Sequence, residues 1–273
     1  MNYVEVTIEF SELHPWRDIV LSELSNRNFE SFVETKSGLK AYIPEKDFKE
    51  TELNFIHDIS AVSDQNHLLI PDQNWNAKWE ENFPPVFVEE KLVIKAPFHQ
   101  QKFEAPYVIT VQPQMSFGTG HHQTTWLMAQ RMFEINLIDK DVLDMGTGTG
   151  VLAILAEKLG AKSVLAPDID EWSYRNAKDN VALNDCHKIE VLLGDHQLLY
   201  GKKFDLIIAN INKNVLIHHF SVYSECLKPG GKLLISGFFT TDQDDLKTIA
   251  EELGFIFEQL ITKDEWALMQ FRC

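Results

Sequence analysis

Hydrophobic and polar positions along the chain follow two regimes, which meet near residue 70. Before that point, alternating stretches typical of half-buried strands are separated by stretches with helical spacing. The order is strand, helix, two strands joined at Ser37 and Gly38, helix, strand, in the stretches 3–10, 14–28, 29–45, 47–60 and 67–71. This is the order of a ferredoxin-like α+β fold, so we expect a small domain of that kind over residues 1–71.

The next stretch, residues 72–85, predicts a linker helix. Asp72 can cap its first turn, and Trp75 and Trp79 are four residues apart on one face. Two consecutive prolines, Pro84 and Pro85, end the stretch because proline cannot continue a helix.

From residue 86 onward the pattern changes. Two strands, at 91–98 and 107–113, and a helix at 124–136 lead into a regular alternation of strands and helices. Such alternation predicts a mostly parallel, Rossmann-like sheet covered by helices on both faces, over residues 86–273. The last two strands have no helix between them, so we expect the final one to insert antiparallel.

Charge limits the classes of partner. The chain has 25 Lys and Arg against 41 Asp and Glu, a net charge of −16. This balance argues against a protein that grips bare nucleic acid, because phosphate binding relies on Lys and Arg. It suits a small-molecule substrate or a basic protein partner, although solubility alone is an alternative explanation.

Other features point to a cytoplasmic protein without metal. No apolar run approaches the roughly 18 residues that would span a membrane, and the acidic, alternating start does not resemble a signal peptide. The three cysteines show no paired or metal-binding spacing. His121 and His122 are adjacent but have no third ligand at a suitable spacing. We also expect a monomer.

A glycine-rich turn, "VLDMGTGTGVL", lies between a clear strand and a clear helix. Gly146, Gly148 and Gly150 let the backbone approach a ligand closely. The spacing departs from the dinucleotide fingerprint, because Val151 stands where that fingerprint has its third glycine. Asp144, at the end of the strand, would repel a pyrophosphate but attract a cofactor with a cationic amino-acid end.

Acidic and amide residues end the following strands. Asp168 is placed to accept hydrogen bonds from a ribose diol, with Asp170 as the alternative. Asp195 can reach an adenine amino group or merely cap a turn. Asn210 can orient an amine at the carboxyl edge of the sheet or cap the helix that begins near Val215. In this order, the features predict S-adenosylmethionine rather than NAD.

A second glycine-rich stretch, "MSFGTGHHQTT", precedes the core sheet and predicts a lid. Phe117 can pack on the cofactor, and Gly118 and Gly120 permit a tight turn. Thr124 or Thr125 begins a helix whose free N–H groups favour a carboxylate.

With both glycine-rich stretches and "ANIN" at 209–212 in view, the chain resembles the PrmA-type methyltransferases. The resemblance covers the whole chain and is strongest from residue 74 to residue 212. It implies a class I methyltransferase fold that uses S-adenosylmethionine, with cofactor positions that correspond to Thr125, Gly146, Asp168 and Asn210.

The resemblance also implies a substrate, ribosomal protein L-eleven of the large subunit, trimethylated on α-amino and lysine ε-amino nitrogens. The chain departs from the usual family pattern at Gln112, Gln114 and Gln123, and in "ANINKNVL" at 209–216. We expect these departures to leave cofactor binding intact and to affect the fine geometry of the substrate.

Methyl transfer to nitrogen needs a neutral amine aligned with the methyl group. An α-amine with a pKa near 8 meets this requirement, whereas a lysine near 10.4 must lose about three units, roughly 4 kcal/mol. Two other functions stay open from the residues alone. One is a class I methyltransferase acting on another amine, protein or nucleic acid, and the other is a nucleotide-binding module without activity.

Overall fold

The computed structural model describes residues 2–71, 80, 83–114 and 116–273. It divides into two compact units, Met1–Phe83 and Pro84–Cys273. Most of the predicted linker helix at 72–85, with Trp75 and Trp79, lies outside the described residues. The predicted domain limits of 1–71 and 86–273, and the roles assigned to the two domains, therefore stay predictions.

The first unit is an antiparallel sheet with helices on one face. Its elements are β1 (Tyr3–Phe10), α1 (Trp16–Ser25), β2 (Ser31–Glu34), β3 (Gly38–Pro44), the short η1 (Glu45–Asp47), η2 (Glu50–Asp58) and β4 (Val62–Ile70). The strand order β2-β3-β1-β4 is that of the predicted ferredoxin-like fold. The second helix, η2, forms as a 3₁₀ helix, and its buried Leu53 and Ile56 are three residues apart, which matches three residues per turn.

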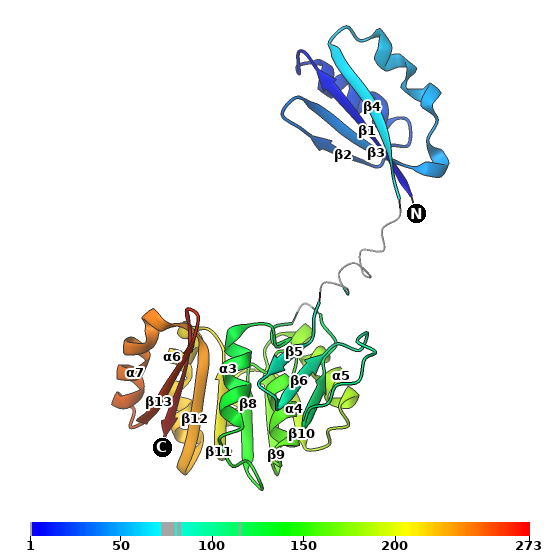
Figure 1. Cartoon of the computed structure of the whole chain (residues 1–273). Coiled ribbons are helices and arrows are strands. Elements are labelled where there is room, and N and C mark those ends of the chain that lie inside the picture. Colours follow the sequence, from blue (N-terminus) through cyan, green and yellow to red (C-terminus); the bar gives the residue numbers. More distant parts are fainter. Residues whose placement is uncertain (1, 72–79, 81–82, 115) are drawn as a thin grey trace. The chain divides into compact units, whose positions relative to one another are not determined.

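The second unit contains a seven-stranded sheet in the order β10-β9-β8-β11-β12-β14-β13 (Figure 1). The strands are β8 (Asp141–Met145), β9 (Ser163–Asp168), β10 (Ile189–Leu193), β11 (Phe204–Asn210), β12 (Leu227–Phe239), β13 (Ile256–Lys263) and β14 (Trp266–Arg272). All pairs are parallel except those of β14, which lies antiparallel between β12 and β13. The predicted mostly parallel sheet with an antiparallel final strand is confirmed.

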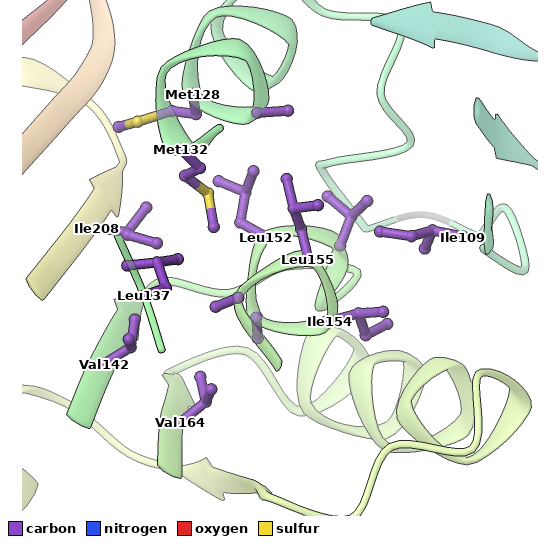
Figure 2. Packing of buried hydrophobic residues seen from close by; sticks show 14 of the residues in the cluster. Ile109, Met128, Met132, Leu137, Val142, Leu152, Ile154, Leu155, Val164 and Ile208 are labelled. Atoms are coloured by element: carbon purple, nitrogen blue, oxygen red, sulfur yellow. The ribbon is translucent and has the colours of Figure 1, made fainter. Parts of the chain in front are cut away.

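Helices cover both faces of this sheet. They are α3 (Gln123–Met132), α4 (Val151–Lys158), α5 (Glu171–Leu183), α6 (Lys213–Cys226) and α7 (Gln243–Glu252). One buried cluster joins α3 and α4 to the sheet, and Figure 2 shows Met128, Met132, Leu152 and Leu155 meeting there. A second cluster joins α6 and α7 to the other face. Burial of these apolar side chains holds the helices against the sheet.

The two strands predicted at 91–98 and 107–113 do not join the main sheet. With β5 (Val86–Val88), they form a separate three-stranded sheet as β6 (Leu92–Lys95) and β7 (Tyr107–Thr110). In the described part of the chain, no helix is both long enough and apolar enough to cross a membrane.

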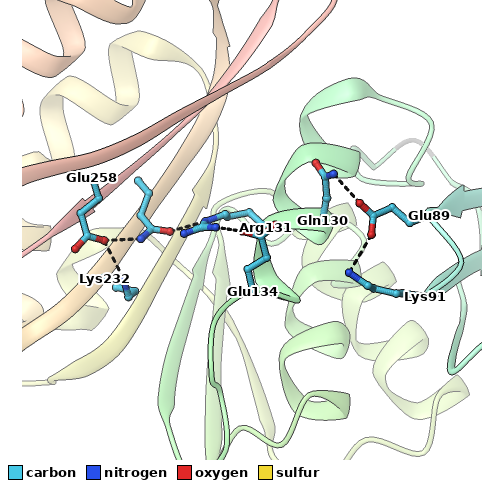
Figure 3. A network of polar contacts seen from close by, with 8 residues as sticks. Glu89, Lys91, Gln130, Arg131, Glu134, Lys232 and Glu258 are labelled. Atoms are coloured by element: carbon cyan, nitrogen blue, oxygen red, sulfur yellow. Dashed lines mark hydrogen bonds and ion pairs between the residues drawn. The ribbon is translucent and has the colours of Figure 1, made fainter.

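Polar contacts hold helix α3 on both sides (Figure 3). The Nε of Arg131 donates to Gln270 in β14 over 2.7 Å, and Gln270 is only 1% exposed. On the other side, Gln130 donates to Glu89, next to β6, over 2.8 Å. The charge-assisted Arg131–Gln270 hydrogen bond is partly buried and stronger than a neutral one, so it fixes α3 relative to the C-terminal strands.

Candidate cofactor and active site

A cavity of about 890 Å³ opens at the carboxyl ends of the central strands. The chain runs outward from β8 to β9 and β10, and then returns to build β11 and β12 on the other side. Ligands of open α/β sheets bind at such a reversal. Six of the seven predicted site residues line the cavity: Phe117, Gly146, Gly148, Asp168, Asp195 and Asn210.

The glycine turn after β8 is packed too tightly for side chains. A Cβ at Gly148 would lie 2.3 Å from the Phe117 carbonyl oxygen, and one at Gly146 would lie 2.5 Å from Ile211. Both glycines also have positive φ values, 57° and 70°. The turn can therefore approach the lid segment and the loop after β11 this closely only because residues 146 and 148 are glycines.

The first glycine-rich stretch docks on this turn. The Thr149 N–H donates to the Phe117 carbonyl over 2.9 Å, and its hydroxyl donates to the Gly118 carbonyl over 2.6 Å. The Phe117 ring is 52% exposed and lies on the cavity wall. The segment thus lies beside the cavity in the position expected for a lid.

Asp144 lies inside the turn and does not line the cavity. This differs from the expectation that it faces a cationic group of the cofactor. It is 2% exposed, and one carboxylate oxygen accepts from the Thr147 hydroxyl at 2.7 Å and the Ala153 N–H at 3.1 Å. Burial raises the pKa of Asp144 to about 6. It borders only a small void of about 10 Å³, together with Thr125 and Asn210.

This burial predicts a pH dependence of stability. Because the folded pKa of Asp144 lies above the ordinary 3.8, the folded chain holds a proton that the unfolded chain releases between pH 4 and 6. The contribution of Asp144 is therefore most favourable below about pH 4 and is lost as the pH rises through 6. We expect the stability of the wild type relative to Asp144→Asn to improve by on the order of 2–3 kcal/mol from pH 7 to pH 4. Urea unfolding of both chains across this range measures the difference, and a constant difference would contradict the buried-acid interpretation.

Asp168 connects the tips of β8 and β9. One carboxylate oxygen accepts from the Gly148 N–H at 2.9 Å and the other from the Asp170 N–H at 3.0 Å. Asp168 is 8% exposed and lines the cavity. Asp170, the alternative, instead caps α5 by accepting from the N–H groups of Trp172 and Ser173. Of these two acids, Asp168 and not Asp170 lies on the cavity wall.

Asp195 and Asn210 differ in which of their two expected roles, ligand contact or helix cap, the structure shows. Asp195 lines the cavity, but it also caps the 3₁₀ helix η3 (His196–Leu199) by accepting from Gln197 N–H at 2.9 Å. The helix that follows β11 is capped by Asn212, whose side chain accepts from Val215 N–H. Asp195 therefore acts as a cap and also lines the cavity, whereas Asn210 is not the cap of the helix that follows it.

The Asn210 amide has one engaged end and one free end. Its Nδ2 donates to the Thr125 hydroxyl over 3.4 Å, while its buried Oδ1 has no hydrogen-bond partner. A buried acceptor without a partner is costly, so this oxygen fits a site that receives a donor from a ligand. Thr125 is fully buried and does not line the large cavity, which places it behind Asn210.

The start of α3 differs slightly from the prediction. The helix begins at Gln123 with His122 as its cap, and Nδ1 of His122 accepts from Thr124 N–H at 3.3 Å. His122 also lines the cavity, where its ring contacts those of Phe117 in a tilted and Trp266 in an edge-on arrangement, with centroids 5.0 and 4.4 Å away. Sequence reasoning missed this aromatic wall, because Trp266 is distant along the chain.

Three histidines that the sequence pattern did not indicate also line the cavity. The ring centroids of His196, His218 and His219 lie 4.8 to 5.7 Å apart. Burial, together with the other two imidazoles, lowers the pKa of His219 to about 4, so it is neutral near pH 7. Across the residues that the structure describes, no cluster of His, Cys, Asp and Glu is suited to hold a metal ion.

Comparisons with known proteins agree with this geometry. Residues 4–273 match the family described as "Ribosomal protein L11 methyltransferase (PrmA)". Proteins of that name from Porphyromonas gingivalis and Phocaeicola vulgatus are 44% and 41% identical, over 99% of this chain and 98% and 99% of theirs. The crystal structure of a ribosomal protein L11 methylase from Lactobacillus delbrueckii subsp. bulgaricus is 30% identical, with a TM-score of 0.64 over 69% of this chain and 98% of that one.

Proposed function

Because the chain belongs to the ribosomal protein L11 methyltransferase family, PrmA, we propose that its 890 Å³ cavity binds S-adenosylmethionine and admits amino groups of that ribosomal protein. The chain is an S-adenosylmethionine-dependent methyltransferase of ribosomal protein L11. We further propose that both the α-amine and lysine ε-amines are acceptors. The observation that carries the site assignment is the buried Oδ1 of Asn210, which has no hydrogen-bond partner although Asn210 lines the cavity.

The cofactor residues are proposed from their places on the wall. The Asp168 carboxylate would accept from the ribose hydroxyls, since each oxygen keeps a lone pair beyond its backbone bond. Gly146 and Gly148 would allow close approach of the backbone, and Phe117 would cover the ligand from the lid. Asp195 would reach the adenine amino group with the oxygen that does not cap η3.

When bound, S-adenosylmethionine supplies an electrophilic methyl group on a sulfonium. The chain's part is to hold a neutral amine in line with that methyl. The Thr125 hydroxyl fixes the Asn210 amide through Nδ2, which leaves Oδ1 to accept an N–H of the incoming amine. An amide oxygen is not a base, so this contact orients the amine without removing its proton.

Lysine acceptors need a lowered pKa, and the cavity wall offers a cause. His122, Trp266 and Phe117 form an aromatic wall, and Met145 also lines the cavity. Removal of water from an ammonium next to such a wall favours its neutral form. We therefore propose that lysines lose their proton as they enter, whereas the α-amine is already largely neutral near pH 8.

Intact-mass measurement tests this function. The chain, S-adenosylmethionine and recombinant ribosomal protein L11 should give a product heavier by whole methyl increments, and peptide mapping should place the methyls on the α-amine and on lysines. A target protein with acetylated amines is the matched control. Methylation of ribosomal RNA but not of the protein would favour the alternative nucleic-acid function.

We propose further that the first unit recognises the ribosomal protein. Every residue of the cavity wall lies in the second unit, between Phe117 and Trp266, and no residue of the first unit lines it. Both observations concern the described residues of each unit. The first 71 residues contain thirteen acidic and six basic side chains, a balance that suits a basic protein partner.

A truncation separates the two proposed roles. A chain that starts at Pro71 should keep its S-adenosylmethionine affinity but lose roughly tenfold or more of its activity on the ribosomal protein, because the docking energy of the first unit is gone. Calorimetry measures the first quantity and initial rates the second. Undiminished activity would contradict the division of labour.

We propose that the enzyme acts as a monomer in the cytoplasm. Its cysteines are free in the structure, with Cys186 and Cys226 buried, which suits a reducing compartment. Sedimentation of the purified chain tests the monomer, and fractionation of cells tests the location.

A further inference from the structure

Three asparagines on helix α5 hold the segment that leads into the lid. Asn184, which caps the helix, exchanges both hydrogen bonds with the backbone of Thr110: its Oδ1 accepts at 2.8 Å and its Nδ2 donates at 2.6 Å. One turn earlier, Asn180 accepts from Gln112 N–H at 2.8 Å. One turn earlier again, Asn176 donates to the Gln112 carbonyl at 3.1 Å.

This pairing is possible because the rise of four helical residues, about one turn, nearly equals the rise of two residues in an extended strand. Four residues of α-helix rise about 6.0 Å, and two residues of extended strand rise about 6.6 Å. Asn184 and Asn180, four apart, can therefore meet Thr110 and Gln112, two apart on the extended segment, and Asn176 adds a second contact to Gln112. Asn176 and Asn180 are completely buried, so the segment has exchanged water for these amides.

Asn180 differs from the other two because it also contacts the cofactor turn. Its Nδ2 donates to the Thr149 carbonyl over 2.8 Å. Thr149 is the residue that binds the lid carbonyls of Phe117 and Gly118. One amide therefore joins the segment before the lid to the turn beneath it.

The contact extends to the proposed ribose acid. Thr149 is linked by a peptide bond to Gly148, whose N–H donates to Asp168 over 2.9 Å. Because Asn180 restrains the Thr149 carbonyl, it restrains the turn that carries the Gly148 N–H. No other side chain among the described residues donates a hydrogen bond to the Thr149 carbonyl in the structure.

We propose that Asn180 is a positioning residue for the cofactor site, acting through Thr149 to keep Gly148 against Asp168 and the lid against the turn. This inference rests on the proposed cofactor site. It assigns Asn180 no contact with the cofactor. Its removal should therefore change the S-adenosylmethionine affinity more than removal of another buried asparagine from α5 does.

The test compares Asn180→Ala with Asn176→Ala in the full chain. Both remove a fully buried asparagine from one face of α5 and both lose a bond to Gln112, but only the first frees the Thr149 carbonyl. Calorimetry gives the dissociation constant of S-adenosylmethionine, rates give kcat and KM, and thermal unfolding gives Tm. We expect Asn180→Ala to raise the dissociation constant and KM by roughly tenfold, and Asn176→Ala to raise them less than about threefold.

A more conservative variant, Asn180→Asp, covers the case in which the alanine variant does not fold. It keeps an acceptor for Gln112 N–H and removes the donor to Thr149, so it should raise the dissociation constant as well. Saturating S-adenosylmethionine should return kcat to near the wild-type value in both Asn180 variants.

The outcomes separate the two proposals. Equal dissociation constants for the Asn180 and Asn176 variants, whether raised or unchanged, would overturn the positioning role. A loss of kcat that saturating cofactor does not restore would overturn it too. A wild-type chain that does not bind S-adenosylmethionine would instead contradict the proposed cofactor site.

Discussion

Replacement of Asn210 by alanine is expected to slow single-turnover methyl transfer by about 100-fold or more, because an amine without a fixed orientation rarely lies in line with the methyl group. Among the described residues that line the cavity, Asn210 is the only one whose side chain has a buried acceptor without a partner, and the variant loses that acceptor. Cofactor affinity should fall less, since the ribose contacts remain. Rapid-quench measurement of one turnover at pH 7 gives the rate directly.

Two further variants sharpen this result. Asn212→Ala removes the actual cap of α6, so it should cost about 1 kcal/mol of stability. Asn212 also lines the cavity, but its side-chain oxygen is engaged by Val215 N–H, so this variant should slow transfer far less than Asn210→Ala does. Asn210→Asp adds a charge that favours the ammonium form of the acceptor, which cannot attack. It should be nearly as slow as the alanine variant at pH 7 and recover partly at pH 9. Wild-type rates in both Asn210 variants would show that the orienting role is wrong.

Asp168→Ala is expected to weaken S-adenosylmethionine binding by roughly 1.5–3 kcal/mol, about 10- to 100-fold, through loss of charge-assisted hydrogen bonds. The structure adds a second cause, because the variant also leaves the N–H groups of Gly148 and Asp170 without their acceptor. Calorimetry with S-adenosylmethionine and with S-adenosylhomocysteine should show similar losses.

Asp170→Ala is the matched control for this prediction. Asp170 was the alternative ribose acid, and in the structure it caps α5. Its removal should lower stability by about 1 kcal/mol and leave cofactor affinity nearly unchanged. If Asp170→Ala weakens binding more than Asp168→Ala does, the assignment of the ribose acid must be reversed.

The features that the sequence predicts well are local. A strand, a glycine turn and a helix are each encoded within about twenty residues, and parallel strands place their carboxyl ends at one edge. Asp168, Asp195 and Asn210 therefore reach the cavity wall as expected. The antiparallel final strand was also predictable, because no helix lies between the last two strands.

The features that the sequence does not predict depend on contacts between distant segments. Trp266 joins His122 because β14 inserts between β12 and β13 in one particular register. Asn180 meets Gln112 and Thr149 only after α5 has packed beside the extended segment. Asp144 at the strand end gave no sign of its inward orientation, which the Thr147 and Ala153 donors determine.

The attachment of the lid has a consequence for turnover. Repeated methylation of one amine, which the family resemblance implies, would require that the spent cofactor leave and a fresh one enter between methyls. Hydrogen bonds hold the backbone of the lid segment at Gln112 and again at Phe117 and Gly118, whereas the Phe117 side chain is half exposed. Side-chain rotation takes picoseconds to nanoseconds, far less than the opening of a tethered loop. Exchange by rotation of this ring would let the backbone stay in place between one methyl and the next, so the acceptor amine need not be released each time.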